Sequence, residues 1–304
     1  MNAADRRILD AAGITDPRLR AAYARCRRLH ARHGRTYYLA SQLLPPWKRP
    51  YVHALYGFAR RADEIVDNGH PATRAEEFRA WSDRALTQLA GAAPAEDPVT
   101  LALRHTMDRW ELPLGQVEAF LGSMAADLTV TDYPTYEDLR RYMYGSAAVI
   151  GLQMTAVLEP LCDEALPRAR ALGEAFQLTN FIRDIAEDLE RGRVYLPAED
   201  LERFGVTRAD LARTPTGGRV RELLRFQIDR NRQLYAYAVG GIRMLHPTSR
   251  PCIETAYRLY SGILEAVEEA DHDILGRRVS VAPVTRLRVA LPAYARARAL
   301  WRTA

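Results

Sequence analysis

The sequence lacks the features that mark several common classes of protein. Its three cysteines, Cys26, Cys162 and Cys252, are far apart and form no CxxC pair, so neither a disulfide framework nor a zinc site is predicted. No stretch of about 18 uncharged apolar residues occurs, and the first residues lead into no apolar segment. Neither a membrane-spanning helix nor a secretory signal peptide is therefore predicted. The expected location is a reducing cytoplasm.

Lysine is almost absent, because Lys48 is the single lysine among 43 basic residues, and the net charge is only +5. The arginines are scattered and form no basic stripe with interleaved aromatic residues, so a nucleic-acid binder is not expected. A GxGxxG dinucleotide fingerprint is also missing, and NADPH is not expected as a cofactor. The sequence implies no protein partner.

The segment from Arg286 to Arg302 is the candidate for contact with a membrane. It mixes five arginines with Leu, Val, Ala, Tyr and Trp, a composition that suits peripheral binding to the anionic inner surface of a bilayer. Pro292 interrupts the segment, and a solvated terminal helix is the interpretation that we favour.

Apolar residues recur with the helical period along almost the whole chain, and the sustained alternation that predicts strands is absent. The expected helices span residues 17–33, 36–44, 47–67, 73–89, 98–109, 113–128, 135–158, 163–191, 218–245, 249–275 and 284–301. Thr135 followed by Asp138 is typical of a capped helix start. We predict one all-α domain that covers residues 1–304.

Two acidic clusters, each with oxygen-bearing side chains four residues apart, are the most informative part of the sequence. At about 100° per residue, each set falls in one narrow stripe of its expected helix. The first stripe carries Tyr56, Arg60, Asp63 and Asp67, and the second carries Gln177, Asn180, Asp184 and Asp188. Carboxylates packed so closely repel each other, and hard divalent cations would offset that cost. Mg²⁺ prefers carboxylate oxygens and bridges to phosphate oxygens, so two such helices predict a site for a diphosphate.

Amphipathic surface helices also carry acids opposite their apolar face, so a solvated stripe is the alternative for each helix alone. Three observations favour the metal site. The spacing occurs on two separate helices, and each stripe also carries uncharged polar groups. Arg60 and Arg183 lie beside the acids, where an anion held by metals would need further donors.

The segments around both clusters resemble the squalene/phytoene synthase family. Residues 56–67, YGFARRADEIVD, are similar to the first aspartate-rich motif of this family, and residues 173–188, GEAFQLTNFIRDIAED, are similar to the second. The match continues through residues 191–197, RGRVYLP. Other family blocks are matched by residues 33–40, HGRTYYLA, residues 142–147, YMYGSA, and residues 260–264, YSGIL. Glu64 stands where many relatives carry a further aspartate, but it lies off the stripe of Asp63 and Asp67.

This resemblance implies a helical bundle of the class I isoprenoid synthase type with a central cavity. It implies the Mg²⁺-dependent joining of two allylic prenyl diphosphates head to head, with Mn²⁺ as an alternative metal. Within the family the chain looks most similar to bacterial phytoene synthases, which join two geranylgeranyl diphosphates through a cyclopropylcarbinyl diphosphate in carotenoid biosynthesis.

The resemblance also implies roles for individual residues. The expected metal ligands are Asp63, Asp67, Asn180, Asp184 and Asp188. Diphosphate would be held by His33, Arg35, Arg60, Arg183 and Arg278, because the planar guanidinium of arginine makes bidentate contacts with such anions. The remaining substrate contacts are expected from Thr36, Tyr37, Tyr56, Tyr142, Phe176, Gln177, Tyr195 and Tyr260. Four aspartates of this set, together with Tyr56 and Arg60, are the expected catalytic residues.

Two alternatives stay open from the sequence. One is a squalene, dehydrosqualene or hydroxysqualene synthase that acts on farnesyl diphosphate, because these enzymes share the first half-reaction and residue spacing does not fix cavity depth. The other is a helical scaffold protein whose acidic faces are merely solvated.

Overall fold

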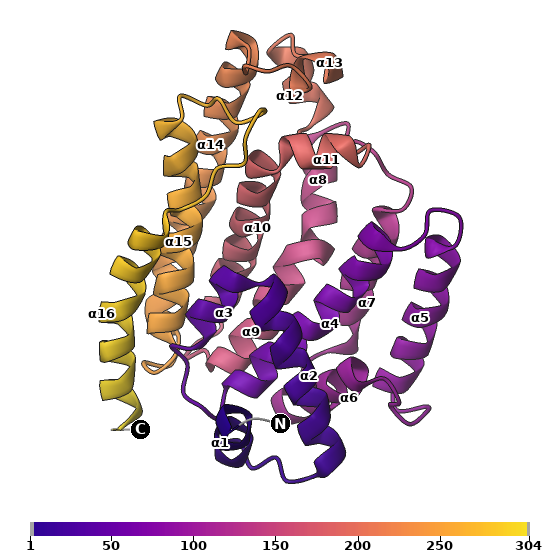
Figure 1. The fold of residues 1–304 in the computed structure, drawn as a ribbon, viewed down its shortest axis with the longest axis vertical. Coiled ribbons are helices and arrows are strands. Elements are labelled where there is room, and N and C mark those ends of the chain that lie inside the picture. The colour runs from indigo at the N-terminus through magenta and orange to yellow at the C-terminus, as the bar shows by residue number, and fades with distance from the viewer. Residues whose placement is uncertain (1–2, 303–304) are drawn as a thin grey trace.

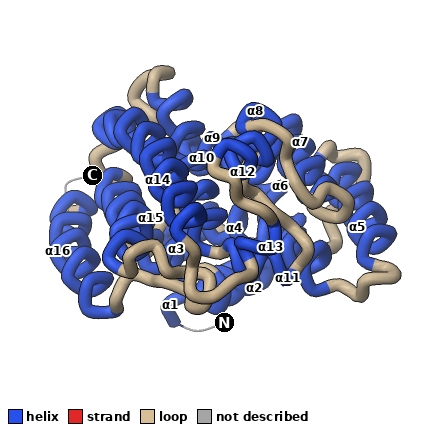
Figure 2. The backbone as a smooth tube through the Cα atoms, turned by 90° about the horizontal axis from the view of Figure 1, so that it is seen from above, coloured by secondary structure: helices blue, strands red, loops and turns tan. Residues whose placement is uncertain are grey.

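The computed structural model describes residues 3–302, which form helices and connecting loops, with no strand among them (Figure 2). An isolated antiparallel bridge joins Pro160 to Leu245. The prediction of an all-α fold is confirmed. Within the described residues, no helix combines the length and apolar character that crossing a membrane requires.

The N-terminal half of the chain supplies nine α-helices and one turn of π-helix, η1. Their bounds are α1 (Ala3–Ala11), α2 (Pro17–His33), α3 (Arg35–Ser41), α4 (Arg49–Asn68), α5 (Arg74–Leu89), α6 (Pro98–Trp110), α7 (Leu114–Ala126), α8 (Tyr136–Met143), η1 (Tyr144–Ala148) and α9 (Val149–Leu158). Side chains cap several helix starts, and the cap predicted at Thr135 is confirmed. Asp16 accepts a hydrogen bond from the backbone N–H of Leu19 at 2.8 Å, and Thr135 and Asp138 form a complete capping box.

The C-terminal half contains three long helices, short connecting helices and a terminal helix. Their bounds are α10 (Ala165–Arg183), α11 (Ile185–Glu190), α12 (Ala198–Arg203), α13 (Arg208–Leu211), α14 (Gly218–Ala238), the 3₁₀ segment η2 (Val239–Met244), α15 (Arg250–Glu269) and α16 (Pro283–Trp301). The outer face of α16 exposes Val284, Leu287 and Leu291. Peripheral binding of this segment to a membrane stays a prediction.

Helix α10 runs through the middle of the molecule, with α14 and α15 on one side and α4 and α7 on the other (Figure 1). One hydrophobic core joins α2, α4, α6 and α7, and a second joins α10, α14 and α15. Phe176 of α10 packs against both cores. The contact between α10 and η1 is close, because a Cβ at Gly173 would lie 2.6 Å from the carbonyl oxygen of Ala147. Glycine at this position therefore allows the two backbones to approach.

Several expected helices differ from the observed ones. The segment expected at 163–191 is interrupted at Asp184, which ends α10 and begins α11. The segment expected at 135–158 contains the π-turn η1, a feature that is frequent at functional sites. Helix α15 ends at Glu269 rather than continuing to residue 275, because Asp271 and His272 adopt left-handed backbone conformations. Helices α1, α12 and α13 were not expected.

Candidate active site

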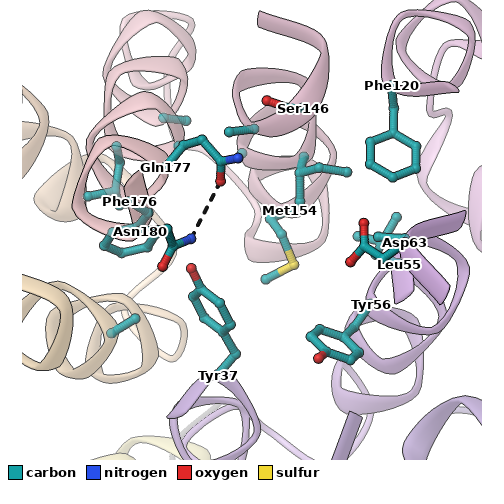
Figure 3. A pocket seen from close by; sticks show the side chains of 18 of the residues that line it. Tyr37, Leu55, Tyr56, Asp63, Phe120, Ser146, Met154, Phe176, Gln177 and Asn180 are labelled. Carbon is teal, nitrogen blue, oxygen red and sulfur yellow. Dashed lines mark hydrogen bonds between the residues drawn. The ribbon is translucent and has the colours of Figure 1, made fainter. Parts of the chain in front are cut away.

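A cavity of about 530 Å³ lies between α4, α7, α9, α10 and α15. One end of the cavity is polar, and the remainder is lined mainly by apolar and aromatic side chains. Figure 3 shows Asp63 of α4 and the Gln177–Asn180 pair of α10 facing the same hollow from opposite walls. The two acidic helices predicted from the sequence therefore contribute to one site.

All five predicted metal ligands line the polar end of this cavity. Asp63 and Asp67 come from α4, Asn180 from α10, Asp184 from the junction of α10 and α11, and Asp188 from α11. Although the helix is interrupted at Asp184, helical backbone hydrogen bonds still connect Asn180, Asp184 and Asp188, which are four residues apart. The backbone N–H of Asp184 donates to Asn180 O at 2.8 Å, and that of Asp188 donates to Asp184 O at 2.8 Å.

Two of these carboxyl groups are held in surroundings that disfavour their charged form. Burial, with the neighbouring Asp67 carboxylate, raises the pKa of Asp63 to about 7. Burial, with the neighbouring Asp184 carboxylate, raises the pKa of Asp188 to about 7. A cation beside these groups would favour their ionised form, so both are suited to metal ligation.

Arginine side chains neutralise the other two carboxylates. Nη1 of Arg193 lies 3.0 Å from Oδ1 of Asp67. Nε of Arg183 lies 2.7 Å and Nε of Arg278 lies 3.0 Å from Oδ1 of Asp184. Among the described residues, no three of His, Cys, Asp and Glu gather closely enough to form a ready-made metal site. Arg193, Arg183 and Arg278 contact the carboxylate oxygens that a metal ion would also have to contact.

The donor set nevertheless fits a hard divalent cation. Oδ1 of Asn180 is buried without a hydrogen-bond partner. The NH₂ group of the same side chain donates to Oε1 of Gln177 at 3.5 Å. An unsatisfied buried carbonyl oxygen is costly, and it is also a good ligand for Mg²⁺ or Mn²⁺. Together with Asp63 and Asp188, this oxygen makes the polar end suitable for metal binding.

Aromatic side chains form much of the wall between the polar end and the apolar interior. The rings of Tyr37 and Tyr260 stack at 4.6 Å, and Phe176 lies 4.6 Å from Tyr260. On the opposite side of α10, Phe181 and Tyr195 stack at 4.1 Å. Such faces stabilise a positive charge by up to about 2 kcal/mol when water is excluded.

Comparison with known proteins shows the family of the chain. The squalene/phytoene synthase family model matches residues 30–286. The 15-cis-phytoene synthase of Synechocystis is 36% identical over 92% of this chain and 86% of its own length, and the phytoene synthase of Arthrospira platensis is 38% identical over 92% and 94%. The chain belongs to the squalene/phytoene synthase family.

Solved structures agree with this assignment. A dehydrosqualene synthase in complex with a ligand matches with a TM-score of 0.84 at 25% identity, covering 92% of this chain and 98% of its own. A squalene synthase from Alicyclobacillus acidocaldarius matches with a TM-score of 0.76 at 27% identity, covering 86% and 99%. The prediction of an enzyme with the squalene/phytoene synthase fold is confirmed, and the scaffold alternative is not supported.

Most substrate residues implied by the family resemblance line the cavity, and a few do not. Those in the wall are Tyr37, Tyr56, Arg60, Tyr142, Phe176, Gln177, Arg183 and Tyr195. Tyr260 lies behind Tyr37 and Phe176, while Arg278 does not line the cavity and pairs with Asp184 and Glu187. His33, Arg35 and Thr36 lie outside the wall, where α2 meets α3, and the first two are exposed. Their roles stay predictions.

Two residues of the polar end were missed as functional candidates. Asp127 is a buried carboxylate that accepts hydrogen bonds from the hydroxyls of Tyr142 and Tyr195, each at 2.8 Å. Burial raises its pKa, and the charge of nearby Arg193 opposes that shift. Asp127 stands alone after an apolar segment, so no spacing signal could have found it. Arg193 lies within residues 191–197, which match the family, and that match could have indicated a functional role for it.

A buried histidine pair supports one wall of the cavity and makes stability pH-dependent. Nδ1 of His30 lies 2.9 Å from Nδ1 of His53, and the His30 ring stacks on Tyr56 at 4.1 Å. Burial lowers the pKa of His30 to about 3, and burial followed by His30 lowers that of His53.

Because both folded pKa values are below the unfolded value of about 6.5, the folded state binds fewer protons at mild acidity. The contribution of these histidines to stability is therefore complete above about pH 6.5 and falls as the pH decreases, by about 2 kcal/mol per histidine at pH 5, whereas the raised pKa values of Asp63 and Asp188 act in the opposite direction and are the same in the variants compared below. Urea unfolding at pH 7 and pH 5 tests this expectation. His53→Gln should reduce the pH dependence, whereas His70→Gln, at an exposed position, should not. Equal dependence in all three proteins would contradict it.

Proposed function

We propose that this enzyme is a phytoene synthase that joins two molecules of geranylgeranyl diphosphate head to head. One observation carries the proposal. The two acidic segments converge with several arginines at one end of a cavity whose remainder is apolar and aromatic. That arrangement suits an amphiphile with an anionic diphosphate head and a long hydrocarbon chain. The relatives named phytoene synthase support the choice of substrate.

The proposed reaction has two ionisations. In the first, a C–O bond breaks and diphosphate leaves with the bonding electrons. The allylic cation then forms a C–C bond to the second molecule, which loses a proton and becomes a cyclopropylcarbinyl diphosphate. In the second, the remaining diphosphate leaves, the cation rearranges, and loss of a proton gives phytoene.

The polar end supplies the groups that bind and neutralise diphosphate. Asp63, Asn180 and Asp188 would hold Mg²⁺, with Asp67 and Asp184 joining them once their arginines turn away. Bound Mg²⁺ supplies Lewis-acid neutralisation of the leaving group. Arg60, Arg183 and Arg193 line the cavity beside these ligands and are placed to donate to phosphate oxygens.

The apolar part of the cavity protects the cation. Tyr37, Phe176 and Tyr56 present ring faces or edges to the hollow and exclude water from the reacting carbons. Exclusion of water also strengthens electrostatic stabilisation by these rings.

A second candidate is the condensation of two farnesyl diphosphates. The likeness to a dehydrosqualene synthase and a squalene synthase favours it, since those structures share the fold of this chain. Identity is higher to the phytoene synthases, which is why the C20 substrate is preferred here.

Incubation with geranylgeranyl or farnesyl diphosphate, followed by hydrocarbon analysis, tests both candidates. We expect a C40 product with Mg²⁺ and without NADPH. Chelation with EDTA should reduce turnover at least a hundredfold, and Mg²⁺ or Mn²⁺ should restore it. Exclusive formation of a C30 product would reject the C20 assignment, and full activity in EDTA would reject the metal requirement.

A further inference from the structure

The apolar end of the cavity is closed by an arginine that has no part in the diphosphate site. The cavity follows α10 from Asp184 back to Arg168, a distance of about 24 Å at 1.5 Å per residue. The walls of this far end are Leu158, Ala165, Ala169, Leu172, Ile242 and Leu245. Of the charged side chains that line the cavity in residues 3–302, Arg168 is the one at this end.

Contacts with η2 and the end of α14 hold Arg168 across the end of the cavity. Its Nη1 donates to the carbonyl oxygen of Tyr237 at 2.5 Å, and its guanidinium lies 4.6 Å from the centre of the Tyr237 ring. Tyr237 is 47% exposed and does not line the cavity, so the half-buried Arg168 extends from the cavity wall toward a ring at the surface.

A pair of glycines makes room for this arrangement. A Cβ at Gly240 would lie 2.6 Å from Nη1 of Arg168, and a Cβ at Gly241 would lie 2.7 Å from Cβ of Arg168. Any other residue at these positions would therefore displace the Arg168 side chain. The arginine lies flat against η2 because the glycines leave that surface free.

Resting on the proposed function, we propose that Arg168 is a specificity-determining residue whose side chain, held by Tyr237 and the Gly240–Gly241 pair, limits the length of the prenyl chain. A chain that ends before Arg168 is buried among apolar side chains. A chain longer by one isoprene unit would press its apolar end against a guanidinium and would have to displace it. In an apolar pocket a single methylene changes specificity by about 10- to 200-fold, so this wall can discriminate between chain lengths.

Measurement of kcat/KM for farnesyl (C15), geranylgeranyl (C20) and geranylfarnesyl (C25) diphosphate tests the proposal. Arg168→Ala should raise the C25-to-C20 ratio at least tenfold, because it lengthens the cavity. Ala165→Leu fills the same end, since Ala165 is buried in its wall, and should lower the C20-to-C15 ratio about tenfold. These opposite shifts distinguish an end wall from a general loss of folding.

Arg203→Ala is the matched control. The Arg203 guanidinium also stacks on an aromatic ring, 4.7 Å from the centre of Phe226, but it does not line the cavity. This variant should keep the wild-type ratios. Unchanged ratios in Arg168→Ala and Ala165→Leu, or the same shift in Arg203→Ala, would overturn the proposal. Failure of the wild-type enzyme to convert any of the three substrates would instead reject the proposed function on which it rests.

Discussion

Replacing Asp63 with asparagine is expected to lower kcat with geranylgeranyl diphosphate by at least a hundredfold, while helix content stays unchanged. The side chain keeps its size but loses the negative charge that a metal ligand supplies, and a hundredfold loss corresponds to about 2.7 kcal/mol of transition-state stabilisation. Asp184→Asn should behave in the same way. Steady-state kinetics with saturating Mg²⁺ and circular dichroism provide the two measurements.

Glu64→Gln is the control for Asp63→Asn, because it removes the adjacent carboxylate from the same helix. Glu64 is turned away from the stripe and forms an ion pair with Arg60, four residues earlier. Its loss should change kcat by no more than a few-fold. Near-normal turnover in both Asp63→Asn and Asp184→Asn would show that these carboxylates do not bind the catalytic metal.

Replacing Arg193 with methionine is expected to lower the free energy of unfolding by about 3 kcal/mol, as when one partner of a buried ion pair is removed. Arg193 is largely buried and pairs with Asp67, and its charge also acts on Asp127. Methionine retains most of the apolar stem, so the loss reports on charge rather than on packing. Urea unfolding in the absence of metal measures it.

Arg191→Met provides the comparison two residues earlier in the same loop. Arg191 is more exposed, and its Nη1 lies 3.9 Å from Oδ1 of Asp188, so its replacement should cost less than about 1 kcal/mol. Lowering the pH to 5 should reduce the deficit of Arg193→Met, because burial raises the pKa of Asp127, Arg193 opposes that rise, and a protonated Asp127 needs no positive partner. A deficit equal to that of Arg191→Met, or one independent of pH, would contradict the proposed role.

Local signals in the sequence account for most of the fold. Helical periodicity located the long helices, and the bounds expected for residues 17–33 agree with α2. The Thr135–Asp138 capping box was predicted because both partners are close in the chain. Short helices such as α13, with four residues, carry too few periodic positions to be recognised.

The acidic stripes were predictable for the same reason, since four-residue spacing on a helix is a local property. What the sequence could not show is which distant groups meet them. Arg193 reaches Asp67 across 126 residues, and Arg278 reaches Asp184 across 94. Asp127 is linked to Tyr195 across 68 residues. These partners depend on how the helices pack, and no pattern within one segment encodes that packing.

The ion pairs at Asp67 and Asp184 would affect the order in which metal ions and substrate bind to the enzyme. Without substrate, these two acidic groups already have internal counter-charges, so a solitary cation meets little net attraction there. When a diphosphate binds together with its metal ion, the arginines can pair with the diphosphate instead of with Asp67 and Asp184. The two carboxylates can then bind the metal ion. Coupled exchange of this kind would leave Asp67 and Asp184 with little affinity for free divalent ions and would favour the loading of these two ligands by the metal–substrate complex.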